Sequence, residues 1–178
     1  MNKLFTPVFH ELEKQREDLL QSVRHLSEEA FNQPPKPGKW SVAQILTHIL
    51  TSEKLSLTYM KRKVQAIDQL KDSGVMESLR LWLLIVSQRI PVKYKAPRVV
   101  VENTPETLTL TQLTEEWANL RKELASFLST INDKHARRVI YKHPMAGRFD
   151  VQQTLIFFRE HIHHHRPQIE RILRHPAK

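Results

Sequence analysis

Apolar side chains recur every three to four residues in several long stretches of the sequence, as in helices that pack one face on a core. The stretches cover residues 6–27, a run that opens at residue 42, residues 76–90, residues 111–131 and residues 151–173. In the first two, the apolar positions are Val8, Leu12, Leu19, Leu20 and Val23, then Val42, Ile45, Leu46, Ile49 and Leu50. The pattern predicts an amphipathic helix over each stretch.

Polar residues and prolines mark the ends of these helices. Ser41 followed by Gln44, and Asp150 followed by Gln153, have the spacing of a capping box at a helix N-terminus. The proline-rich segment FNQPPKPGKW ends the first helix and forms a rigid connector to the second. We therefore expect the second helix to begin after Ser41 and the last to begin after Asp150.

Two connections lack helical periodicity. Residues 92–110, which include Pro97 and Pro105, form an irregular stretch that is long enough to cross over a bundle. A second connector before Asp150 has a short predicted strand at residues 138–142. The sequence predicts an all-α protein, a four-helix bundle with one long crossover connection, folded as a single domain over residues 1–178.

Composition and charge narrow the class of protein. The chain is 40% hydrophobic and 26% charged, as soluble globular proteins are, and no apolar run approaches the ~20 residues that span a bilayer. The formal net charge is +9, but the basic residues are dispersed and no nucleic-acid-binding motif accompanies them, so we do not expect nucleic acid as a partner. With no signal peptide and no cysteine, we expect a cytoplasmic protein without disulfides or thiolate ligands.

Four histidines occur within the five residues HIHHH at positions 161–165. On a helix His161 and His165 lie only about 40° apart, so both can bind one cation, whereas His163 points to the opposite side. His164 lies at a flank, and its role stays open. His48, at the border of the apolar face of the second helix, is the best candidate for a third ligand. The alternative is that these are histidines at the edge of the core, each hydrogen-bonded to a carbonyl.

The sequence gives weaker evidence for a role of other residues in a metal or substrate site. Glu53, Ser52 and Glu160 could contact a ligand, but each is more simply explained as a surface or packing residue. His143 is better explained by a turn than as a fourth ligand. The three tryptophans are predicted to lie in the core, although one could line a substrate pocket; they are Trp40, Trp82 and Trp117.

Two motifs together resemble the DinB/YfiT-like superfamily. The segment GKWSVAQILTHILTSE contains Trp-Ser with His48 seven residues after Ser41, and HPMAGRFDVQQTLIFFREHIHHHRPQIERIL contains a His-Pro-x-x-Gly turn and H-x-x-x-H followed by Gln-Ile. The resemblance covers about residues 5–175. It implies a four-helix bundle, often a homodimer, that holds zinc or nickel on three histidines: His48, His161 and His165. Two departures are Gln44, where glutamate is frequent, and Pro167, which should kink the last helix.

This resemblance also implies a range of functions. Three histidines leave at least one position on a divalent ion for water or substrate, which is typical of catalytic sites. The superfamily includes thiol-dependent S-transferases and probable hydrolases, so the first hypothesis is a metal-dependent enzyme of either kind. It would act on a small-molecule substrate, with a low-molecular-weight thiol as cosubstrate, and its catalytic residues are unknown. The alternative is a non-catalytic dimeric bundle that binds metal or a small molecule in stress response.

Overall fold

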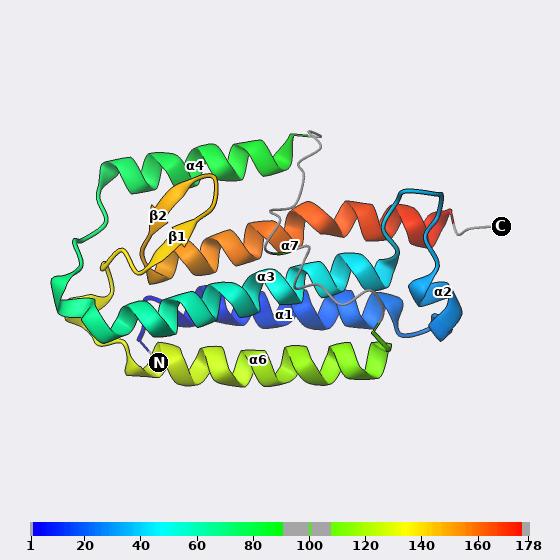
Figure 1. Ribbon diagram of the computed structural model, residues 1–178, viewed down its shortest axis with the longest axis horizontal. Helices are drawn as coiled ribbons and strands as arrows, with labels where there is room; N and C mark the ends of the chain where they lie inside the picture. The colour runs from blue at the N-terminus through cyan, green and yellow to red at the C-terminus, as the bar shows by residue number, and fades with distance from the viewer. Residues whose placement is uncertain (1, 91–99, 101–107, 176–178) are drawn as a thin grey trace.

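The computed structural model describes residues 2–90, residue 100 and residues 108–175 (Figure 1). Four long helices form the bundle: α1 (Thr6–Val23), α3 (Val42–Lys63), α6 (Leu110–Thr130) and α7 (Val151–Arg174). Helix α3 packs against both α6 and α7, and α1 packs along α7. The predicted four-helix bundle is confirmed.

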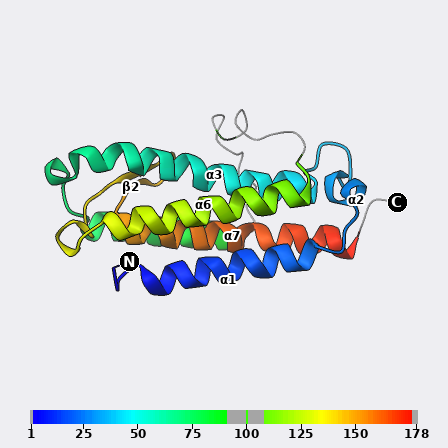
Figure 2. The ribbon, with the colours of Figure 1, turned by 90° about the horizontal axis from the view of Figure 1, so that it is seen from below.

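The direction of the helices explains the crossover. In Figures 1 and 2, α3 and α6 run the same way, and α1 and α7 run the opposite way. Parallel neighbours such as α3 and α6 cannot be joined by a short turn. Their connection includes η1 (Val64–Gln69) and α4 (Val75–Arg89), and most of the predicted irregular stretch 92–110 lies outside the described residues.

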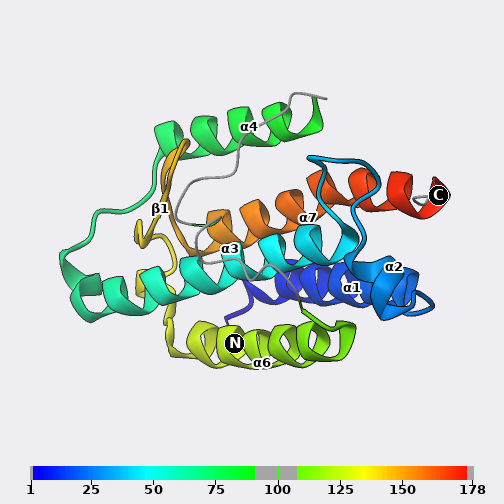
Figure 3. The same ribbon diagram turned by 45° about the vertical axis from the view of Figure 1, so that its right-hand side comes forward.

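Helix α4 lies outside the four-helix bundle, as Figure 3 shows. It packs on α7 and on a small hairpin of β1 (Tyr141–His143) and β2 (Gly147–Phe149), which are antiparallel. The predicted strand at residues 138–142 is therefore displaced by up to three residues. The turn includes Gly147 at φ 89°, a backbone conformation that glycine adopts without a steric penalty.

The helix boundaries agree with the predictions at the capping boxes and depart from a predicted bound by more than one residue at the end of the first helix. Both predicted boxes are present, at the start of α3 and of α7. The first helix, however, ends at Val23 and not at Ser27, because the Ser27 hydroxyl accepts a hydrogen bond from Ala30 N and caps the separate helix α2 (Glu28–Asn32). Helix α7 is continuous through Pro167, so the proline lies inside it and the kink expected there stays a prediction.

The core lies between the four bundle helices and is built from the predicted apolar positions, with Leu12, Leu46, Ile49 and Phe158 nearly inaccessible to solvent. The prediction that all three tryptophans are buried is wrong. Trp117 is fully buried, but Trp40 is 38% exposed and Trp82 is 57% exposed. Trp82 is exposed because it lies on α4, which is outside the four-helix bundle. Trp40 lies directly before Ser41, the N-cap of α3, and so precedes the helix. Within the described helices, none is long and apolar enough to cross a membrane.

Candidate metal centre

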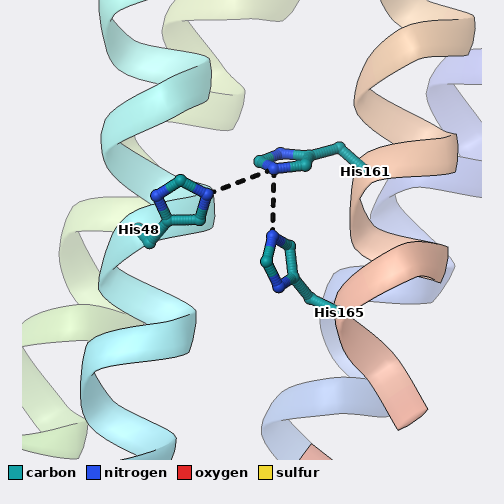
Figure 4. Close-up of side chains that lie close together, drawn as sticks. All are labelled: His48, His161 and His165. Atoms are coloured by element: carbon teal, nitrogen blue, oxygen red, sulfur yellow. Dashed lines mark hydrogen bonds between the residues drawn. The ribbon is translucent and has the colours of Figure 1, made fainter. Parts of the chain in front are cut away.

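Three histidines from two neighbouring helices meet inside the bundle (Figure 4). His48 lies on α3, and His161 and His165 lie one turn apart on α7. Each helix begins at a capping box, whose side chains stabilise the first turn. The first residue of each helix determines which later residues share the face that carries the histidines. The three side chains are buried, with exposed fractions of 5%, 9% and 7%. The structure thus brings together the residues that the sequence singled out.

The three Nε2 atoms converge on a small volume. His161 Nε2 lies 3.2 Å from His48 Nε2 and 3.1 Å from His165 Nε2. All three ligand atoms lie within 4.8 Å of one another. Nitrogen ligands about 2.0–2.1 Å from one tetrahedral ion lie roughly 3.3–3.4 Å apart. The separations from His161 are therefore close to those of nitrogens that share a cation.

Burial keeps the three rings uncharged at neutral pH. Desolvation, with a smaller contribution from His164, lowers the pKa of His48 to about 4. The same effect lowers the pKa of His165 to about 3, and burial together with the neighbouring histidines lowers the pKa of His161 well below its ordinary value. Neutral imidazole has the free lone pair that a metal requires. The site presents that form without having to lose protons near pH 7.

The hydrogen-bond partners of the Nδ1 atoms indicate which ring nitrogen carries the proton. His165 Nδ1 lies 3.0 Å from Gln168 Oε1, so the neutral ring donates from Nδ1 and leaves the Nε2 lone pair free. Within the described part of the chain, Nδ1 of His48 and of His161 has no hydrogen-bond partner. The contacts between Nε2 atoms cannot all be good hydrogen bonds, because a neutral ring has only one N–H to donate. Three neutral nitrogen donors suit zinc, nickel, copper or iron.

Aromatic side chains surround two of the rings. The Trp40 ring lies 5.1 Å from the His48 ring, and the Phe157 ring stacks on His161 at 5.5 Å with an interplanar angle of 24°. Phe157 was not among the candidate residues from the sequence, although it lies four residues before His161 and therefore on the same helical face. These contacts restrict the orientation of both imidazoles.

The other two histidines of the cluster lie away from the three converging nitrogens. His163 is exposed, as its position on the helix predicted. His164 Nδ1 lies 2.7 Å from the Gln88 carbonyl oxygen, so it connects α7 to α4. This contact answers the question that the sequence left open about His164.

His143 has the turn role that the sequence analysis favoured. Its Nδ1 accepts hydrogen bonds from the backbone amides of Met145 and Ala146, at 3.2 and 3.0 Å. Burial lowers the pKa of His143 to about 4, which keeps Nδ1 free to accept. The ring therefore stabilises the β1–β2 turn and is not part of the group of three.

Neither glutamate considered in the sequence analysis belongs to the histidine group. Glu53 is buried and accepts hydrogen bonds from Trp117 Nε1 and from Arg121, both at 2.9 Å. Glu160 is buried between Arg89 and Arg159. Both are packing residues held by ion pairs, and a surface location is wrong for either. Ser52 contributes its carbonyl oxygen to the Ser56 hydroxyl.

Comparison with known proteins places this arrangement in a family. The family model of the DinB superfamily matches residues 11–169. The uncharacterized protein YuaE of Bacillus subtilis (strain 168) is 26% identical over 150 residues, which cover 84% of this chain and 87% of that protein. The solved structure of YfiT from Bacillus subtilis, described as a probable metal-dependent hydrolase with an unusual four-helix bundle topology, superposes with a TM-score of 0.62. It is 18% identical, and the match covers 98% of this chain and 89% of YfiT. Because the family model spans most of the sequence, the chain belongs to the DinB superfamily.

Proposed function

We propose that this protein is a metal-dependent hydrolase that binds one divalent ion, zinc or nickel, through His48, His161 and His165. The observation that carries the proposal is the convergence of three buried, neutral Nε2 atoms within 4.8 Å. The structural similarity to YfiT, itself described as a probable metal-dependent hydrolase, supports the same class of chemistry at the level of the fold.

Each neighbouring residue has a definable task in this proposal. Gln168 holds the proton of His165 on Nδ1, so that Nε2 faces the site. Trp40 and Phe157 hold the rings of His48 and His161 in place and keep apolar surface around them. A divalent ion bound here would act as a Lewis acid that lowers the pKa of a coordinated water or thiol.

The nucleophile separates the two enzyme classes. Hydrolysis uses water, whereas S-transfer uses a thiol. The chain has no cysteine, so in a transferase the thiol would have to come from a low-molecular-weight cosubstrate. We place hydrolysis first because it needs no cosubstrate other than water and agrees with the description of YfiT.

Metal analysis of the purified full-length chain tests the site. Protein prepared without a metal-affinity step and incubated with zinc or nickel should retain about one ion per chain after desalting. His48→Ala, His161→Ala and His165→Ala should each lose that ion, because two imidazoles rarely hold a metal alone. His163→Ala is the matched control, since this exposed histidine lies on the same helix. Equal loss of metal in the control, or none in the three variants, would contradict the proposal.

Turnover assays then distinguish the classes. Metal-loaded protein is given a panel of esters and amides in ¹⁸O-labelled water, with and without a small thiol. Incorporation of ¹⁸O into the product, absent in His165→Ala, supports a hydrolase. A thioester that forms only with the thiol, with release of the alcohol or amine, indicates the transferase. Stoichiometric metal without turnover in either arm favours the non-catalytic alternative.

A further inference from the structure

The bundle is least closely packed between α1 and α6. Close backbone contacts join α1 to α7, α7 to α3 and α3 to α6, so the fourth side, between α6 and α1, is the most open. A hollow of about 230 Å³ lies on this side, lined by side chains from Phe9–Arg16 and Ala118–Ala125, and we call it the α1–α6 hollow. Because a cavity of about 150 Å³ can hold benzene, the α1–α6 hollow has room for a small organic molecule.

Arg121 lines the α1–α6 hollow and has an incomplete set of hydrogen bonds. Its side chain is 2% exposed, and its Nη2 donates to Glu53 Oε1 at 2.9 Å. Its Nε lies 3.0 Å from Glu13 Oε1 without making a hydrogen bond, and Nη1 has no hydrogen-bond partner within the described part of the chain. Buried donors in folded proteins nearly always have a partner. The guanidinium group therefore has unused N–H groups beside a hollow that can hold an acceptor.

Positive charge dominates the wall of the α1–α6 hollow. Arg16, Arg121 and Lys122 line it, together with one carboxylate, that of Glu13, which lies 3.2 Å from Arg16 and 3.0 Å from Arg121. The acidic partner on α3 balances Arg121. Arg16 also lies 3.6 Å from Glu17, but that side chain is 68% exposed and solvent screens its charge. Lys122 has no acidic partner among the described residues, so the wall favours a ligand with one negative charge.

The rest of the wall is apolar and consists of Phe9, Ala118 and Ala125. An apolar wall beside unused guanidinium N–H groups suits a ligand with a hydrocarbon body and an oxyanion head. A carboxylate carries one negative charge, whereas a phosphate monoester carries nearly two at neutral pH. We propose that the α1–α6 hollow binds a small organic monocarboxylate, with its head at Arg121 and Lys122 and its body against the apolar wall.

This site is separate from the histidine group. The α1–α6 hollow is lined by α1 and α6, whereas the three histidines lie on α3 and α7, and the two sets share no residue. The proposal therefore does not rest on the metal site, and it is tested with metal-free protein from which the chelator has been removed.

Titration with benzoate, followed by ligand-observed NMR, tests the role of charge. Benzoate should half-saturate the full-length chain at about 1 mM or below, and the neutral isostere benzamide should bind at least about tenfold more weakly. Lys122→Glu should weaken benzoate binding at least about tenfold, because it replaces the unpaired cation with a like charge. Lys142→Glu makes the same change at an exposed lysine of β1 and should leave the affinity unchanged.

A second pair of variants tests the location. Ala118→Leu fills the apolar part of the α1–α6 hollow and should weaken benzoate binding at least about tenfold. Ser126→Leu, at an exposed position of the same helix outside the hollow, is its matched control. Arg121 is left in place, because without it Glu53 would remain buried without its cation.

Circular dichroism and thermal midpoints verify that each variant is folded. Weaker benzoate binding in Lys122→Glu and Ala118→Leu, with both controls and His165→Ala unchanged, supports the site. Half-saturation above about 10 mM, equal binding of benzamide, or wild-type affinity in both variants overturns the proposal. Loss of binding in His165→Ala also overturns it, because benzoate would then lie at the histidines. None of these outcomes depends on whether the histidines bind metal.

Discussion

His48, His161 and His165 must remain neutral when the protein is folded, because their positions allow little solvation of a positive charge. The unfolded chain has no such constraint and takes up protons near the ordinary histidine pKa of 6.5. Between about pH 6.5 and pH 4 the unfolded state therefore binds more protons than the folded state. The stability that neutral burial allows is fully present above pH 6.5 and is lost progressively as the pH falls to the folded pKa values of about 4 and 3.

This difference gives a prediction for the metal-free protein. Its free energy of unfolding, measured with urea, should fall steadily from pH 7 to pH 4.5. His161→Leu should make that dependence shallower, since it removes one of the buried titrating groups. His163→Ala, at an exposed position on the same helix, is the matched control and should keep the wild-type slope. The same slope in all three proteins would show that these buried rings do not control the acid sensitivity.

At the scale of one element, α7 carries two of the three candidate ligands, and its first turn is held by Asp150. The Asp150 carboxylate accepts hydrogen bonds from Gln153 N and from the Ser73 hydroxyl, which lies in the connection before α4. Asp150 is buried, whereas the equivalent cap of α6, Thr109, is in an exposed hydrogen-bonded turn. The Asp150 cap therefore connects the start of α7 to the segment before α4.

We expect Asp150→Ala to destabilise the protein by about 1–2 kcal/mol, at the upper end of the range for a lost N-cap. Thr109→Ala, the comparison at α6, should cost less because its partners are exposed. Asp150→Asn should recover most of the loss, since the amide oxygen can still accept from Gln153 N. Chemical unfolding of the three variants measures this order, and an equal loss in Asp150→Ala and Thr109→Ala would refute the role of burial.

For helix α4 the predicted bounds were nearly correct, but the predicted burial of one of its side chains was wrong. Its periodicity predicted residues 76–90, and the helix runs from Val75 to Arg89. The same periodicity suggested that Trp82 was in the core, yet its side chain is 57% exposed. An amphipathic pattern reports that an apolar face exists, but it does not say whether the same chain covers it.

At the scale of the whole molecule, a buried ion pair connects three helices. Arg121 of α6 contacts Glu53 of α3 at 2.9 Å and Glu13 of α1 at 3.0 Å, and the side chains of Arg121 and Glu53 are each 2% exposed. Burial raises the pKa of Glu53, although Arg121 and Trp117 oppose the rise. Desolvation of the charges therefore offsets much of their attraction, as expected for a pair inside a bundle.

We predict that Arg121→Met destabilises the bundle by about 3–5 kcal/mol, because Glu53 would remain buried without its cation. Adding Glu53→Gln should recover a large part of this loss, since the neutral amide can still accept from Trp117 Nε1. A double-mutant cycle in urea measures the coupling. Losses that simply add would mean that the pair does not act as a unit.

Local features determined much of this protein. Capping boxes and apolar periodicity specified the starts of α3 and α7, because the interactions involved lie within four residues of each other. The i, i+4 spacing placed His161 and His165 on one face and His163 on the other, since helical geometry alone sets those angles. The position of His48 at the border of an apolar face and the resemblance to a family both pointed to it as the third ligand. The family model that matches residues 11–169 confirms the family.

Only the tertiary structure decided what depends on contacts between distant segments. The distance from His48 to His161 joins residues 113 positions apart, and the packing of α3 on α7 sets it. The link from His164 to the Gln88 carbonyl, the burial of Glu53 beside Arg121 and the outward face of α4 follow from the same packing. A sequence pattern specifies which side of a helix is apolar, but which neighbour that side meets is settled by the balance of burial over the whole chain.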